Sequence, residues 1–176
     1  SARIEQLIAA MDESDHHTGD RTAPTHAATA SGGDSDTATG IEPTRLTAVE
    51  RLDEITGVGQ RAAQTIIAEI GLDMTRFPTP EHLVSWAKLC PRTIQSGLVI
   101  RKTGKGNPYL KGALGEAAAA AARTDTFLGE RYRRLVKRRG KLKALVAVAR
   151  SILVIAWQLL SDTTARFHDL GPDYHT

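Results

Sequence analysis

Apolar residues recur at helical spacing over most of this chain. Near its start, four of them occupy positions i, i+3, i+4 and i+7, as on one face of a helix, namely Ile4, Leu7, Ile8 and Met11. Residues 1–12 are therefore expected to be the remnant of a helix. Residues 13–45 consist largely of Asp, Ser, Thr, Gly and Ala and hold little that a core can bury. That composition predicts a flexible, disordered polar linker.

From residue 46 onward the pattern predicts helices with definite ends. Thr47 and Glu50 have the spacing of a capping box at the start of the first helix. Gly71 is expected to cap the second helix, and Gly140 to separate the last two. Residues 98–104 favour a short hairpin inside an irregular stretch. The further helices are expected at about 60–70, 80–89, 108–123, 126–138 and 141–161.

These helices have enough apolar residues for one core. The last helix carries a stripe that is expected to be buried, made of Leu142, Leu145, Val146, Ala149, Leu153, Ala156 and Leu160. Trp86 and Trp157 lie in apolar stripes and are expected in the core. The alanine run 117–122 suits close packing of helices. The predicted fold class is all-α, a compact helical domain over residues 46–162 with a helix-hairpin-helix element, followed by a tail at 163–176.

Charge is distributed unevenly along the chain. The net charge is +3, but residues 1–45 hold eight acids and three bases, a balance of −5. Residues 46–160 hold nineteen bases and nine acids, a balance of +10. A domain with such an excess of cations is expected to bind an anionic partner, most often nucleic acid.

Other protein classes fit the sequence poorly. A single cysteine, Cys90, gives neither a disulfide framework nor a zinc-binding spacing. The longest apolar stretch, 144–160, contains Arg150 and is shorter than the ~20 residues of a membrane span. No signal peptide is apparent. A soluble, intracellular protein that is not associated with a membrane is expected.

Residues 55–71, "ITGVGQRAAQTIIAEIG", have the pattern of a helix-hairpin-helix. Gly57 and Gly59 are expected to adopt positive φ, and their amides, with the start of the next helix, can point at a phosphate oxygen. Val58 is expected to fill the core between the two helices. The alternative is a plain corner between two helices that needs two glycines for its geometry.

Residues 90–114, "CPRTIQSGLVIRKTGKGNPYLKGAL", combine many cations with a serine that is expected to be exposed on an irregular loop. Ser96 stands beside Gly97, and Asn107 with Pro108 begins a helix. The surrounding cations suit a phosphate and its transition state, namely Arg92, Arg101, Lys102, Lys105 and Lys111. The alternative is a simple Ser96–Gly97 turn within a solvated nucleic-acid surface.

Residues 130–143, "ERYRRLVKRRGKLK", hold eight bases and one acid. Like charges at helical spacing destabilise a helix unless a polyanion compensates them, which favours nucleic-acid backbone as the partner over a merely solvated helix. The expected contacts from this tract are Arg133, Arg134, Lys137 and Arg138. The basic part of the chain has no acids clustered at metal-binding spacing, so no metal site is expected in it.

An ordered set of motifs carries a family resemblance. Four features follow one another over about residues 46–161, namely "GVGQRAAQTIIAEIG", "RFPTPEHLVSWAKLCPRTIQSG", "KTGKGNPYLKGAL" and a long basic helical end. This order resembles the C-terminal domain of insertion-sequence transposases that have a DEDD-type RuvC-like N-terminal domain. That family is related to the Piv-type site-specific DNA invertases, and some members are guided by a bridge RNA.

The resemblance implies specific roles. The family's serine nucleophile in the "SG" element corresponds to Ser96, which would attack a DNA phosphodiester and form a phosphoserine link. The Mg²⁺-binding acids belong to the RuvC-like domain, which these residues lack, so the chain alone is expected to be inactive and to need no cofactor. DNA, a guide RNA, the RuvC-like domain and further copies are the expected partners. The alternatives are a non-catalytic helix-hairpin-helix module that binds DNA and a small RNA-binding scaffold.

Overall fold

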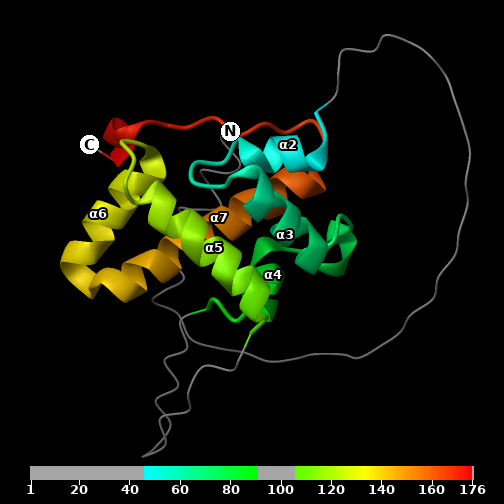
Figure 1. Ribbon diagram of the computed structural model, residues 1–176, viewed down its shortest axis with the longest axis horizontal. Coiled ribbons are helices and arrows are strands. Elements are labelled where there is room, and N and C mark those ends of the chain that lie inside the picture. The colour runs from blue at the N-terminus through cyan, green and yellow to red at the C-terminus, as the bar shows by residue number, and fades with distance from the viewer. Residues whose placement is uncertain (1–45, 91–105, 176) are drawn as a thin grey trace, which may run out of the picture.

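The computed structural model describes residues 46–90 and 106–175, which form a domain of packed helices (Figure 1). Short 3₁₀ turns occur at η2, Met74–Arg76, and η3, Pro172–His175. No strand is present in these two ranges. The all-α prediction is therefore confirmed. The helices are α2 Ala48–Asp53, α3 Gln60–Ile70, α4 Pro80–Trp86, α5 Pro108–Ala121, α6 Phe127–Arg139 and α7 Lys141–Ser161.

Local capping chemistry sets most helix ends where the sequence predicts them. The Thr47 hydroxyl accepts from the Glu50 amide at 3.3 Å, and the Glu50 carboxylate accepts from the Thr47 amide at 2.7 Å. This reciprocal pair is the predicted capping box. Gly71 ends α3 with φ of +78°, and Gly140 separates α6 from α7 with φ of +82°. Both positions favour glycine because left-handed φ strains other residues.

Two helices end before their predicted last residue. α4 ends at Trp86 and α5 at Ala121, because the chain tightens after each into bonds of i to i+3 type. The Lys88 amide donates to the Ser85 carbonyl at 3.1 Å, and the Arg123 amide donates to the Ala120 carbonyl at 3.1 Å.

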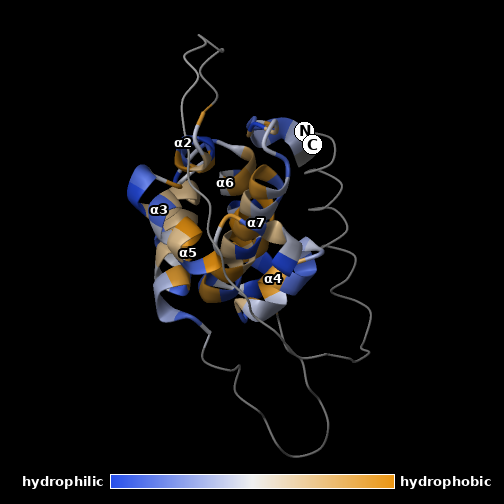
Figure 2. Ribbon diagram, turned by 90° about the vertical axis from the view of Figure 1, so that its right-hand side faces the viewer, coloured by the Kyte–Doolittle hydropathy of each residue, from blue (hydrophilic) through white to orange (hydrophobic). Residues whose placement is uncertain are grey.

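α7 is the central helix of the domain. It contacts α2, α4, α5 and α6, and Figure 2 shows it as a largely hydrophobic ribbon in the middle of the domain. α7 is long and apolar enough for a membrane span, contrary to the expectation that its apolar stretch is too short, but 67% of its most apolar 18-residue segment is buried inside the fold. α7 thus has the burial of a core helix. The Arg51 side chain of α2 holds the C-terminal end of α7. It donates to the carbonyls of Leu159 and Asp162, the latter at 3.1 Å.

Three residues that were expected in the core lie at the surface. Leu142 is 76% exposed and Val146 39% exposed, because the start of α7 lies at a corner that projects away from α3 and α4 (Figure 1). Trp86 is 41% exposed and rests against Phe77, with ring centroids 5.5 Å apart. Trp157 is half-buried, and its indole N–H donates to the Phe77 carbonyl at 2.9 Å.

The C-terminal tail after α7 packs back onto the helices. Arg166 forms an ion pair with Glu54, the C-cap residue of α2. Asp169 accepts from the Phe127 amide at the start of α6 at 3.1 Å, and the ring of Tyr174 meets Phe127 edge-on with centroids 5.4 Å apart. The tail therefore connects α2 to α6 across one side of the domain (Figure 1). The predictions for residues 1–45 and for a hairpin at 98–104 lie outside the described residues.

Candidate nucleic-acid interface

The turn between α2 and α3 packs closely against α5. Gly57 has φ of +85°, as predicted. A Cβ added there would lie 2.3 Å from the Ala117 carbonyl oxygen and 2.8 Å from the Ala121 amide nitrogen. Val58 is 3% exposed, as expected for a core residue, and its amide donates to the Ile55 carbonyl at 2.9 Å. Gly57 is therefore required by helix packing, and the Val58 amide is already bonded within the turn.

Gly59 differs from its neighbour in both conformation and surroundings. Its φ is −91°, so the prediction of positive φ at this position was wrong. Gly59 is the N-cap of α3, and N-cap residues adopt extended backbone. No side chain caps α3, and the space where a Cβ would stand at Gly59 is open. Arg61 in the first turn of α3 is exposed, and phosphate binding at the start of α3 stays a prediction.

Asn107 fastens the start of α5 to α3. Its side-chain oxygen accepts from the amides of Tyr109 at 2.9 Å and Leu110 at 3.1 Å. Its side-chain N–H donates to the Glu69 carboxylate of α3. Both ends of the Asn107 amide are thus engaged within the fold, which the sequence analysis did not anticipate. Its predicted contact with nucleic acid is untested.

The residues on either side of the 91–105 stretch lie close together. A Cβ added at Gly106 would lie 2.6 Å from the Ala87 carbonyl oxygen and 2.7 Å from Cε of Lys111. Lys111 therefore borders this junction of α4 and α5. The other predicted site residues of this region lie outside the described residues, and their roles stay predictions, namely Arg92, Ser96, Gly97, Arg101, Lys102 and Lys105.

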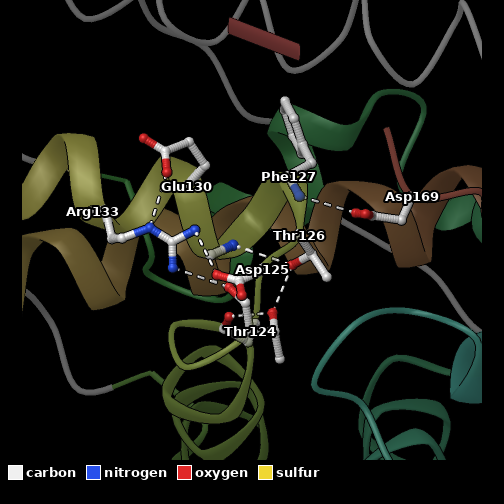
Figure 3. A network of polar contacts seen from close by, with 9 residues as sticks. Thr124, Asp125, Thr126, Phe127, Glu130, Arg133 and Asp169 are labelled. Carbon is white, nitrogen blue, oxygen red and sulfur yellow. Dashed lines mark hydrogen bonds and ion pairs between the residues drawn. The ribbon is translucent and has the colours of Figure 1, made fainter. Parts of the chain in front are cut away.

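A polar network closes the turn between α5 and α6 (Figure 3). The Arg133 guanidinium donates to Glu130 at 2.9 Å and to the Thr124 carbonyl at 3.2 Å, and lies 3.5 Å from Asp125. The Thr126 hydroxyl caps α6 by accepting from the amide three residues later at 3.3 Å. The charge of Arg133 is thus paired within the fold, and its predicted nucleic-acid contact is untested.

Among the residues that the structure describes, the densest run of exposed cations lies where α6 ends and α7 begins. We call residues 134–143 the basic corner, since they hold six cations and no acid. Five of these cations are exposed and Arg134 is half-buried. Gly140 makes the sharp turn, and the space beside it is open. The exposed cations are Lys137, Arg138, Arg139, Lys141 and Lys143.

Some of the cations at the basic corner stabilise the helix that carries them, and others destabilise it. The cations in the last turn of α6 suit the negative end of that helix. Lys141 and Lys143, however, lie at the positive end of α7, where no acidic residue and no side-chain cap is present. Cations at that end destabilise a helix by roughly 0.3–1 kcal/mol each. An anion bound at the basic corner would relieve this repulsion.

The described residues do not supply a metal site. No group of three His, Cys, Asp or Glu side chains in residues 46–90 and 106–175 is placed to hold a metal ion.

Known proteins with similar sequences point to one family. Residues 49–133 match the family described as "Transposase IS116/IS110/IS902 family". The "Insertion element IS110 uncharacterized 43.6 kDa protein" of Streptomyces coelicolor is 36% identical over 118 residues, which cover 64% of this chain and 29% of that protein. The "Pilin gene-inverting protein" of Moraxella bovis is 28% identical over 115 residues, covering 62% of this chain and 35% of that protein.

The matched residues cover the helices that position the predicted site. The chain spans about a third of the length of these curated relatives. The family match includes α2 to α5 and position 96 but ends at Arg133, so the case for the basic corner depends on the structure. The family resemblance inferred from the motifs is confirmed. Residues 49–133 of this chain are thus similar in sequence to the IS116/IS110/IS902 transposase family.

Proposed function

We propose that this chain is the nucleic-acid-binding helical part of a transposase or site-specific DNA recombinase, and that the basic corner seats DNA phosphates. One observation carries the proposal. Six cations without an acid gather at an exposed corner, and two of them, Lys141 and Lys143, stand at the helix end where cations are least stable. A binding partner with regularly spaced negative charges compensates this arrangement.

The same geometry supports binding to backbone rather than to base edges. Lysine and arginine contacts to phosphates fix the position of a protein on DNA and carry no sequence information. The open start of α3 at Gly59 is a second position for a phosphate. α6 extends from the α5 side of the domain to the basic corner (Figure 1), a length of about 20 Å for its 13 residues. Phosphate contacts at both positions would fix the orientation of a bound duplex.

The proposal assigns the chemistry to Ser96. Its hydroxyl oxygen attacks the scissile phosphorus, the phosphorus–oxygen bond to the leaving sugar breaks, and the proton goes to the released sugar hydroxyl. The resulting phosphoserine ester keeps the phosphate in an activated diester, so that another sugar hydroxyl can attack it and rejoin the strand. The support is the "SG" element at this position and the family match across it. As the family resemblance implies, Mg²⁺ is assigned to the RuvC-like domain, and a guide RNA and further copies are proposed partners.

Charge neutralisation at the corner tests the binding proposal. The variant Lys137→Gln with Arg138→Gln should lower the affinity of the full chain for duplex DNA about tenfold, because two phosphate contacts are lost. Fluorescence anisotropy at fixed salt measures this. Arg76→Gln with Arg123→Gln is the matched control, because it removes the same charge from exposed residues outside the corner. Equal losses in the two double variants would show that only net charge matters and would contradict the assigned surface.

Covalent trapping tests the serine. In the full-length protein with its guide RNA and Mg²⁺, Ser96→Ala should abolish the protein–DNA adduct and leave affinity within a few-fold, since one hydroxyl contributes about 1 kcal/mol to binding. An adduct that persists in this variant, or that maps to Cys90 or a tyrosine, would remove Ser96 from the mechanism. DNA binding without any adduct in the unaltered protein would favour the non-catalytic binding module instead.

A further inference from the structure

The basic corner also exposes apolar surface. Leu142 is 76% exposed and Val146 is 39% exposed, and their i, i+4 spacing puts both on one face of α7. Lys141 and Lys143 flank Leu142 in sequence and are exposed as well. Phosphate binding explains the lysines but gives no reason for an exposed leucine and valine among them. The surface as a whole fits a partner that is both acidic and apolar.

The chain itself contains a segment with that chemistry. Residues 1–15 have apolar positions at i, i+3, i+4 and i+7, namely Ile4, Leu7, Ile8 and Met11. The same residues hold four acids and one base, Arg3, with the acids at Glu5, Asp12, Glu13 and Asp15. This is an apolar stripe accompanied by negative charge, complementary in both respects to an apolar pair accompanied by positive charge.

We propose that residues 1–15 dock on the basic corner of the same chain, with the apolar stripe on Leu142 and Val146 and the acids beside the exposed lysines and arginines. Docking there would cover cations that the proposed function assigns to nucleic acid. The segment would therefore act as an internal competitor that is displaced when nucleic acid binds. This competition rests on the proposed function, whereas the docking itself does not.

The length of chain permits this contact. Thirty residues, 16–45, separate the segment from Leu46 at the start of the described domain, and thirty residues span up to about 100 Å when extended. The longest helix, α7, has 21 residues, a length of about 31 Å. Distance therefore does not restrict which face is chosen, and surface chemistry decides.

The other exposed apolar residues are poorer candidates. Within the described ranges the large exposed hydrophobic side chains are Leu72, Trp86, Tyr109, Leu142, Val146 and Tyr174. Of these, Leu142 and Val146 are the two that lie at helical spacing on one helix, and they adjoin five exposed cations. Leu72 is 59% exposed but is followed by Asp73, so it offers an acidic segment no comparable attraction.

Disulfide trapping in the full chain tests the docking without nucleic acid. In a Cys90→Ala background, which removes the native cysteine, Leu7→Cys is combined with Leu142→Cys, or with Leu72→Cys as the matched control. The first pair should form an intramolecular disulfide about tenfold faster, because docking raises the local thiol concentration, and 1 M salt should slow it. Equal rates for the two pairs, or disulfides formed only between two chains, would overturn the proposal.

The competition has a separate measurement. Glu5→Gln with Asp12→Gln should raise the affinity of the full chain for duplex DNA a few-fold, and excess DNA should slow the Leu7–Leu142 disulfide. Unchanged affinity and an unchanged trapping rate would contradict competition. Disulfide trapping in a chain that binds no nucleic acid would refute the proposed function and leave the docking intact. DNA binding without disulfide trapping would refute the docking and leave the proposed function intact.

Discussion

Two glycines that join helices, Gly57 and Gly140, have the same left-handed backbone and opposite surroundings. Gly57, with φ of +85°, faces the backbone of α5, where no Cβ fits. Gly140, with φ of +82°, has open space beside it and exposed cations on both sides. The glycine of the recognisable motif, Gly57, is thus required by helix packing, whereas Gly140 lies in the exposed cationic surface that we propose binds phosphate. A glycine pattern in the sequence indicates a tight turn. The residues that surround the turn in the fold determine whether it serves packing or binding.

The largest expected effect is on the free energy of unfolding, which should fall more for a substitution at Gly57 than for one at Gly140. Gly57→Ala should lower the free energy of unfolding by at least about 3 kcal/mol, because it adds backbone strain and a clash with the Ala117 carbonyl. Urea denaturation measures this. The control is Gly115→Ala within α5, where the space is open and alanine should raise stability by about 0.5–1 kcal/mol. A Gly57→Ala variant as stable as the unaltered protein would contradict the close approach of α5.

The next effect concerns the open turn. Gly140→Ala should lower the free energy of unfolding by about 1–3 kcal/mol, because only the backbone conformation is strained and no neighbour is displaced. The loss should therefore be smaller than for Gly57→Ala in the same urea titration. A larger loss at Gly140 than at Gly57 would mean that the basic corner is packed against other parts of the chain.

The smallest effect concerns the tail. The hydrogen bond from Arg166 lowers the pKa of the Glu54 carboxyl below its usual range. A lowered pKa stabilises the fold above the usual glutamate value of about 4.3, and this contribution is lost as pH falls through the lowered pKa. Arg166→Gln should therefore reduce Tm slightly at pH 7 and not at low pH. An equal reduction at both pH values would show that Arg166 acts through packing alone.

Local chemistry made most of the helix ends predictable. Thr47 with Glu50, Gly71 and Gly140 act within a few residues of themselves, so the sequence specifies their geometry directly. Burial was less predictable, because periodicity identifies the inner face of α7 but not how far neighbouring helices cover it, as Leu142 and Val146 show. Gly59 was wrongly given positive φ because the motif treats its two glycines alike, whereas one of them is an N-cap.

The engaged side chains of the site could not be found from sequence spacing. Asn107 bonds to Glu69, and Arg51 bonds to Leu159, across separations of 38 and 108 residues. Such pairings depend on the packing of α3 on α5 and of α2 on α7. The cationic tract, in contrast, was evident from the sequence, and the structure adds that its exposed part is the corner after Arg133.

The salt dependence of DNA binding tests the central claim, that the basic corner binds phosphate, most directly. Each phosphate contact adds about −0.9 to the slope of log K against log salt. Lys141→Gln with Lys143→Gln should therefore make the slope of the full chain shallower by about 2, without lowering the free energy of unfolding. The Arg76→Gln with Arg123→Gln control should keep the original slope. An unchanged slope in the lysine variant, or the same change in the control, would contradict the assignment of the basic corner as the phosphate-binding surface.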